Sequence, residues 1–316
     1  MLADDGMIVR DAVALAERPE ALPPRADLMA KASRMLEDLL RTRGAKVGDD
    51  YAGPVLVEND AAATLVSQAF MSLFLARRAP DSDDQRGEGM AQAGTTPFLT
   101  RIGNRVLPES FTVKDTPSMT RFGVLPVGGA YVVDDEGVPA QDVTLVQGGR
   151  LLTLLTSRTP QRNLPSSNGH ARGGGPQAGV FQMESAEAIP AAELKAKYLA
   201  LLKMQGRAFG YIVRRLGAPA GRGGTPLTVA VRVTPDGKEE PVRGLTLGGV
   251  THTTFRDILA ASVERTLLTS GSPNGIAGGA TLISVIAPSL IFEELEIQRN
   301  KEPLQKKPLV PSPIGR

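Results

Sequence analysis

Residues 51–63, with the sequence YAGPVLVENDAAA, contain the clearest boundary between a strand and a helix in this chain. The apolar run 54–57 predicts a short buried strand. Asp60 stands near the start of the helix that we expect to follow. The apolar face of that helix is set by residues three or four apart, namely Ala62, Leu65, Ala69, Leu73 and Ala76.

The sequence before this boundary predicts another amphipathic helix. Asp27 is a plausible N-cap, and Gly44 ends the run after two basic residues, as is typical of helix ends. Between them the apolar residues recur at helical spacing: Leu28, Met29, Ala32, Met35, Leu36, Leu39 and Leu40.

From about residue 106 onward, short apolar runs bounded by Gly, Pro and Asp predict strands. We expect a third helix over 191–205 and a fourth over 255–268, capped by Thr253 or Thr254. The pattern favours an α+β fold, with a β-rich, antiparallel, barrel-like body and about four helices, because no regular βαβ alternation is present. The predicted strands are 111–115, 130–133, 143–146, 151–155, 209–216, 227–234, 242–247, 281–286 and 290–297.

Composition excludes several classes of chemistry. The 316 residues contain no Cys and only two His, so disulfides, thiolate metal sites and Cys nucleophiles are excluded. The net charge of +2 comes from dispersed basic residues, which does not favour a nucleic-acid-binding surface. No apolar run reaches the ~20 residues of a membrane span, and no secretory signal is visible, so we expect a cytoplasmic protein.

Two motifs have candidate roles. Asp134, Asp135 and Glu136 precede Gly137, and we interpret them as a structural turn whose acidic side chains accept backbone N–H bonds. Consecutive residues on an extended chain alternate faces, so all three could hardly chelate one cation. The second motif is His170, which lies in a long loop rich in Gly, Pro, Ser and Asn, over 156–177. Unstructured loops of that length are usually functional or disordered.

Five segments follow one another along the chain: YAGPVLVE (51–58), YVVDDEGVP (131–139), VQGGRL (146–151), SNGHAR (167–172) and PVRGLTLG (241–248). Taken together and in this order, they resemble the C-terminal domain of the TldD/PmbA metallopeptidases, long described as modulators of DNA gyrase. The second segment is the most specific of the five. The resemblance covers most of the chain.

The resemblance implies a peptidase family that works as homo- or heterodimers and admits extended, unfolded peptides to an inner cavity. Active members carry His-Glu-x-x-x-His on the helix after the first segment, and a late Cys as a third zinc ligand. In this chain Val57 and Ala62 stand where the two His would be, and only Glu58, the general-base position, is kept. The segment 270–279 contains no Cys. The resemblance therefore implies no metal ligands and no cofactor in this chain, and leaves open whether it is an enzyme.

We therefore expect a PmbA-like, non-catalytic subunit that pairs with a TldD-like, zinc-bearing homologue and helps to enclose peptides. The peptide-facing residues that we predict are Asn168, His170 and Arg172. Extended peptides commonly bind by adding a strand to a sheet edge.

Two alternatives remain open. The first is an active peptidase with Glu58, Asp60 and His170 around a metal ion. The second is a peptide-binding or self-assembling protein with no peptidase partner. For the domains, we expect a helical remnant of an N-terminal domain over 1–50, the family domain over 51–299, and a tail rich in Pro and Lys over 300–316.

Overall fold

Five strands of the computed structural model close into a barrel. The structure describes residues 1–12, 22–77, 97–161, 163–218, 224–272 and 281–300. Around the barrel, each strand pairs with the next and the last pairs with the first. The five strands, in their order around the ring, are β2 (Tyr51–Val57), β9 (Gly210–Leu216), β10 (Thr225–Val233), β12 (Leu245–Leu247) and β14 (Thr281–Arg299).

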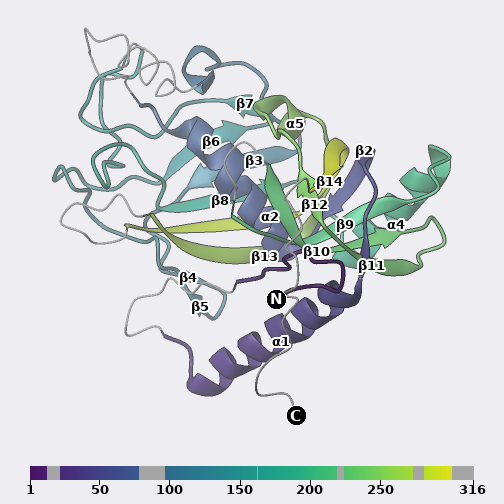
Figure 1. The fold of residues 1–316 in the computed structure, drawn as a ribbon. Coiled ribbons are helices and arrows are strands. Elements are labelled where there is room, and N and C mark those ends of the chain that lie inside the picture. The colour runs from purple at the N-terminus through teal and green to yellow at the C-terminus, as the bar shows by residue number, and fades with distance from the viewer. Residues whose placement is uncertain (13–21, 78–96, 162, 219–223, 273–280, 301–316) are drawn as a thin grey trace, which may run out of the picture.

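The longest strand, β14, joins the barrel to a flatter extension of the same sheet (Figure 1). One edge of β14 pairs with β13 (Ile258–Ser272) and then with β12. Its other edge pairs with β8 (Val180–Ser185) and then with β2. The extension continues from β8 through β3 (Phe111–Asp115), β6 (Val143–Gln147) and β7 (Arg150–Leu151). Most pairs are antiparallel; β1–β11, β2–β9 and β8–β14 are parallel, with β1 at Lys46–Val47 and β11 at Glu239–Arg243.

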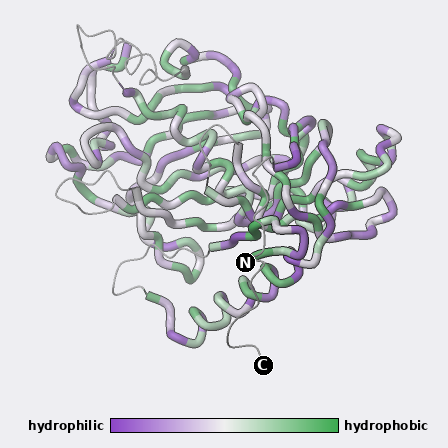
Figure 2. Tube along the Cα trace, in the orientation of Figure 1, coloured by the Kyte–Doolittle hydropathy of each residue, from purple (hydrophilic) through white to green (hydrophobic). Residues whose placement is uncertain are grey.

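The main core lies around the helix that follows β2. This helix, α2 (Asn59–Leu65), continues as a π-helical turn (Val66–Phe70) and a 3₁₀ turn (Met71–Phe74). Its aromatic residues pack with those of other segments: the ring of Phe70 stacks on that of Phe255 at 4.3 Å between centroids, and Phe74 meets Phe181 at 5.4 Å. Figure 2 shows the hydrophobic segments concentrated in the strands and in α2.

A second apolar layer covers the outside of the barrel. Because side chains alternate along a strand, Val55 and Val57 belong to the main core while Leu56 points to the opposite face. There Leu56 packs beneath α4 (Ala191–Met204), whose buried residues are Leu194, Tyr198 and Leu202.

The predicted helices at 191–205 and 27–44 are confirmed as α4 and α1 (Arg25–Gly44), but the predicted helix at 255–268 is wrong. That segment is strand β13, preceded by the short helix α5 (His252–Arg256) with a capping box from Thr251. The run has no helix-breaking residue, but its pairing with β14 overrides local propensity, as non-local pairing commonly does.

Five strand predictions also differ from the structure. The predicted strand 151–155 keeps only Leu151 in β7 and a bridge from Leu155 to Leu75, and 242–247 is divided between β11 and β12. Residues 130–133 form only an isolated bridge, from Val133 to Pro139, because the chain turns at Asp134. The two predicted strands at 281–286 and 290–297 are one continuous strand, β14. Strand β8 was not anticipated. With α1, α2, α4 and α5, the described part of the chain has four α-helices, as expected.

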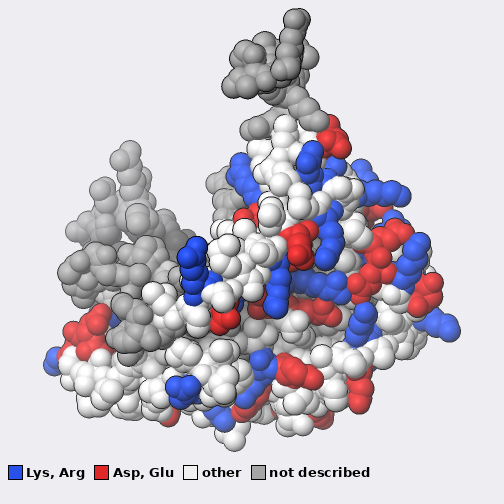
Figure 3. Space-filling view, turned by 90° about the horizontal axis from the view of Figure 1, so that it is seen from below, with Lys and Arg blue, Asp and Glu red and all other residues white. Residues whose placement is uncertain are grey.

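The remaining short elements lie around this body. They are the 3₁₀ turn Pro97–Thr100 and the two-stranded β4 (Arg121–Phe122) and β5 (Leu125–Pro126). Among the described residues no helix is long and apolar enough to cross a membrane. In Figure 3, Lys and Arg side chains lie among Asp and Glu side chains over the visible face. Residues 78–96, the segment 273–280 and the predicted tail from 301 onward lie outside the described residues.

Candidate functional site

The turn at residues 134–137 is built around the buried carboxylate of Asp134. Its Oδ1 accepts the backbone N–H groups of Glu136 at 3.0 Å and Val138 at 2.8 Å. Gly137 has φ of +77°, in the left-handed region that favours glycine. The acidic side chain here satisfies backbone donors inside its own turn.

The same acidic residues also hold the long loop over residues 157–176. Each of the three carboxylates accepts a backbone N–H from that loop. The three carboxylates thus accept two N–H groups from the turn and three from the loop. The cluster therefore holds the loop in place. The loop contacts are Ala171 to Asp134 Oδ2 at 3.0 Å, Gly173 to Asp135 Oδ2 at 2.7 Å, and Arg158 to Glu136 Oε2 at 2.6 Å.

Beneath the loop lies a buried pair formed by His170 and Asp115. Both side chains are fully inaccessible, and Nε2 of His170 lies 3.2 Å from Oδ1 of Asp115. Asp115 ends β3, and its carboxylate also accepts the N–H groups of Gly179 and Val180 at 3.1–3.3 Å. A buried charge needs this density of partners, because burial without them costs several kcal/mol.

Hydrogen bonds of Asn168 orient the ring of His170. Nδ1 of His170 lies 3.0 Å from both the backbone oxygen and Oδ1 of Asn168. The orientation of the Asn168 amide is fixed, because Oδ1 accepts the N–H of Thr156 at 2.8 Å and Nδ2 donates to the oxygen of Leu154 at 2.9 Å. Nδ1 therefore faces acceptors only and must carry a proton. On the other side of the ring, Nε2 faces the Asp115 carboxylate at 3.2 Å.

Unlike His170, Arg172 lines a cavity. Its guanidinium carbon lies 4.4 Å from the centroid of the Tyr131 ring, and Nη1 donates to the oxygen of Ala178 at 3.2 Å. The Tyr131 hydroxyl donates to the oxygen of Gly169 at 2.8 Å. Burial, and next the charge of Asp115, raise the pKa of Tyr131, which therefore stays a neutral hydrogen-bond donor.

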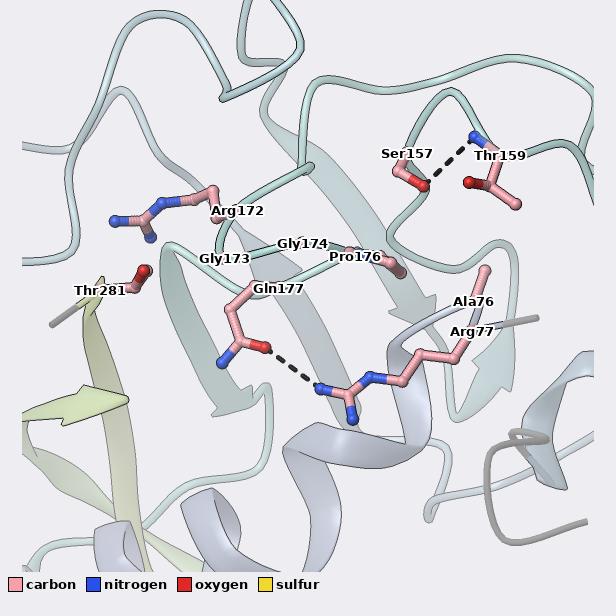
Figure 4. A pocket seen from close by; sticks show the side chains of 11 residues that line it. Ala76, Arg77, Ser157, Thr159, Arg172, Gly173, Gly174, Pro176, Gln177 and Thr281 are labelled. Carbon is pink, nitrogen blue, oxygen red and sulfur yellow. Dashed lines mark hydrogen bonds between the residues drawn. The ribbon is translucent and has the colours of Figure 1, made fainter. Parts of the chain in front are cut away.

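The cavity has a volume of about 280 Å³ and is shown in Figure 4. Arg77, which follows the helical segment after β2, lines it together with Arg172. The side chain of Gln177 lies between the two guanidinium groups in Figure 4, and its Oε1 is 3.4 Å from Nη2 of Arg77. Hydroxyl groups of Ser157, Thr159 and Thr281 complete the polar lining.

Glu58 lies elsewhere, at the junction of β2 and α2. Its Oε2 accepts a hydrogen bond from Nε of Arg214, on β9, at 3.1 Å. Arg214 also donates to both carboxylate oxygens of Glu239, at 2.9 and 3.0 Å, and Lys195 approaches Glu239 at 2.7 Å. Burial alone would raise the pKa of Glu239, but the hydrogen bonds from Lys195 and Arg214 outweigh it and hold that pKa below its usual value.

The two positions flanking Glu58 in the zinc motif carry no metal-binding atoms. Val57 belongs to β2 and Ala62 to α2, and both side chains are buried in the main core. Among the residues that the structure describes, no three His, Cys, Asp or Glu side chains gather where they could hold a metal ion. The alternative that Glu58, Asp60 and His170 surround a metal is therefore wrong for this structure, because Glu58 contacts Arg214 while His170 contacts Asp115.

Of the predicted site residues, the structure brings Asn168, His170 and Arg172 together with the 134–137 turn, and places Glu58 apart from them. Asn168 and His170 bind the loop to the sheet, whereas Arg172 lines the cavity. Sequence reasoning missed Asp115, Tyr131 and Arg77. A signal existed for Asp115, because it shares the buried face of β3 with Phe111 and Val113. A carboxylate on such a face indicates a fully bonded, buried group.

Comparisons with known proteins agree on one family. A family model described as the PmbA/TldA metallopeptidase C-terminal domain matches residues 50–299. A metalloprotease of Archaeoglobus fulgidus is 33% identical over 92 residues, which make up 29% of this chain and 20% of that protein. The alignment thus spans about a fifth of that relative.

Solved structures show the same fold. A candidate modulator of a DNA gyrase from Thermotoga maritima is 18% identical with a TM-score of 0.60, over 88% of this chain and 56% of its own. TldE from Thermococcus kodakarensis is 17% identical with a TM-score of 0.57, over 86% of this chain and 56% of its own. The chain therefore spans about half the length of these proteins.

Proposed function

The chain belongs to the PmbA/TldD metallopeptidase family through its C-terminal domain, and from this premise we propose that it is a non-catalytic subunit of a peptidase. In this role it helps to enclose extended peptides for a zinc-bearing homologue. The observation that carries the proposal is the start of α2, where Val57 and Ala62 are buried apolar residues and Glu58 is paired with Arg214. A catalytic zinc site needs three protein ligands and an open position for water.

The open edge of β13 supports the enclosure of extended peptides. On its inner edge β13 pairs with β14 over most of its length. On the outer edge, the pairing found among the described residues is a single bridge, from Ser262 to Ile189. From Arg265 onward the strand can therefore accept an added peptide strand through its backbone N–H and C=O groups. Backbone pairing tolerates many peptide sequences.

Metal analysis together with a digestion assay tests the absence of catalysis. The purified full chain should contain substoichiometric zinc by elemental analysis and should leave casein and unstructured peptides intact. Stoichiometric zinc together with cleavage that a chelator abolishes would overturn the proposal. Glu58→Gln sharpens the assay, because loss of a measured cleavage activity in this variant would assign the general base to Glu58.

Isolation from the native host tests the partnership. A homologue with His-Glu-x-x-x-His and a late Cys should copurify with the tagged chain, in equal amounts in a heterodimer. If only further copies of this chain are recovered, the result would instead support a homo-oligomeric binding protein. As a further part of this proposal, we place the complex in the cytoplasm.

A further inference from the structure

We propose that the cavity between Arg77 and Arg172 binds an oxyanion, supplied by the C-terminal carboxylate of an extended peptide. The assignment of a peptide as the source rests on the proposed function; the anion site itself does not. The cavity measures about 280 Å³, which suits the end of a ligand and not a folded partner.

The charge of the lining carries the first step of the argument. Its ionisable side chains are two arginines, and no Asp or Glu lines the cavity within the described part of the chain. The carboxylates of the 134–136 turn are not part of the lining; Asp135 and Glu136 accept the backbone N–H groups of Gly173 and Arg158 in the loop. Within the described part of the chain, the side chains that line the cavity therefore carry two positive charges and no negative charge, and the remaining polar groups, three hydroxyls and the Gln177 amide, are hydrogen-bond donors as well as acceptors.

The geometry of Arg172 carries the second step. Its guanidinium is stacked at 4.4 Å over Tyr131 and anchored at the oxygen of Ala178, and Tyr131 is itself anchored at Gly169. A guanidinium held in one plane is preorganised for the two parallel bonds that it makes to a carboxylate. Little side-chain entropy is lost when such a group binds its ligand.

Arg77 provides a second, adaptable cation on the opposite side of Gln177 (Figure 4). Its side chain is exposed, and its contact with Gln177 is long, at 3.4 Å. The wall between the arginines is formed by glycines, of which Gly173 and Gly174 have φ of +64° and +91°. Without Cβ atoms there, a peptide end can approach the backbone closely.

The test compares two peptides that differ only in the terminal group. An N-acetylated, unstructured pentapeptide with a free carboxylate is titrated into the full chain by calorimetry, and the same peptide with an amidated C-terminus is the control. We expect the amide to bind at least ten times more weakly, and the carboxylate to lose affinity as salt is raised, because its attraction is electrostatic. Equal affinities would overturn the proposal.

Charge-reversal variants place the effect in the cavity. Arg77→Glu, at an exposed position, should weaken binding of the carboxylate peptide about tenfold or more and leave the amidated peptide unaffected. Lys203→Glu makes the same change of charge on an exposed residue of α4 and should leave both affinities as they are. Arg172→Lys keeps the charge but removes the planar fork, and should bind several times more weakly. Wild-type affinity in Arg77→Glu would overturn the proposal even if Arg172→Lys does not fold.

Two further outcomes separate this inference from the proposed function. Titration with inorganic phosphate distinguishes the source of the oxyanion: binding of phosphate that depends on Arg77, without a preference for the free peptide carboxylate, would overturn the peptide terminus as the ligand. A carboxylate preference in a chain that proves to hold zinc and cleave peptides would support the cavity and overturn the non-catalytic role. If a chain without zinc binds the carboxylate peptide and the amidated peptide equally well, the non-catalytic role would be supported and the assignment of the cavity overturned.

Discussion

His170 and Asp115 show how a polar pair can act as a structural element of a core. Both side chains are fully buried, and every polar atom of the pair faces a hydrogen-bond partner. The pair links the end of β3 to the loop that carries Arg172. The position of a cavity-lining arginine therefore depends on residues that never touch the cavity.

Asp115→Ala should lower the free energy of unfolding by about 3–5 kcal/mol, the usual loss when one member of a buried pair is removed. The variant leaves His170 and the N–H groups of Gly179 and Val180 without their acceptor. Urea unfolding at pH 7 measures the loss. Asp60→Ala, at an exposed position, is the control and should cost no more than about 1 kcal/mol. Similar losses in both variants would contradict the assigned role.

His252 presents the opposite case, a polar atom in the described structure that is buried without a partner. Its Nε2 has no hydrogen bond, and its ring lies against Phe98 at 6.2 Å between centroids. Partial burial, and then the charges of Arg101 and Arg256, lower the pKa of His252 below 6.5. As the pH falls through 6.5, His252 binds a proton in the unfolded chain but not yet in the folded chain, where its pKa is lower. The free energy of unfolding therefore decreases.

His252→Phe should therefore stabilise the chain by about 1 kcal/mol at pH 7.5, because it removes the unsatisfied nitrogen. The advantage over the wild type should be larger at pH 5.5, where the wild type is further weakened by the protonation of its unfolded state. Unfolding curves of both proteins at the two pH values measure this. A wild type that is the more stable protein at pH 5.5 would refute the prediction.

At the scale of elements, α1 differs from the other long helix, α4. The apolar residues of α4 are buried against the barrel, whereas Met29, Leu36 and Leu40 of α1 are 58%, 48% and 50% exposed. Within the described part of the chain, the contacts that hold α1 lie in its second half, at Asp38 and at the buried Thr42. Helical stability in proteins comes mainly from packing of the apolar face, so the first half of α1 has little to stabilise it.

We expect the amides of residues 28–34 to exchange with solvent at least a hundred times faster than those in the middle of α4. Hydrogen exchange followed by mass spectrometry resolves the two segments, and α4 serves as the internal reference within the same sample. Fast local exchange reports opening of a segment with few buried contacts. Protection of α1 equal to that of α4 would show that another surface covers its exposed face in solution.

The same contrast explains which elements the sequence could predict. Helices α1 and α4 have clear 3.6-residue patterns, and the pattern predicts a helix whether or not its face is later covered. For 255–268 the local pattern predicts a helix, but the segment forms strand β13 because it pairs with β14, which begins further along the chain at Thr281. The acidic turn could be inferred from Asp134 and Gly137, but the pairing of Asp115 with His170 depends on chain packing between residues 55 positions apart.

At the scale of the whole molecule, β14 is the central strand. It pairs with β2, β8, β12 and β13, and so connects the barrel with the extension of the sheet. Val57 pairs with Leu290, which links the first barrel strand to the last across most of the chain. Such non-local pairing predicts slow folding, because loops must close before the contacts form.

A chain that ends at residue 280 should therefore fail to fold, although it keeps every strand except β14. Without β14 the barrel is open between β2 and β12, and β13 has no long partner. Circular dichroism and limited proteolysis would show a weak, non-cooperative β signal and rapid cleavage. Adding the missing strand back as a synthetic peptide of residues 281–300 should restore protection. Cooperative unfolding of the shortened chain alone would disprove the prediction.

The late position of β14 also has a consequence for synthesis in the cell. A ribosome makes the chain from the N-terminus, so β2, α2 and β9 emerge long before the strand against which β2 must pair. Until residue 299 has left the exit tunnel, the edge of β2 that pairs with β14 has no partner strand. The nascent protein thus cannot fold domain by domain as it appears. Its hydrophobic segments therefore need protection from aggregation until the ribosome has synthesised β14.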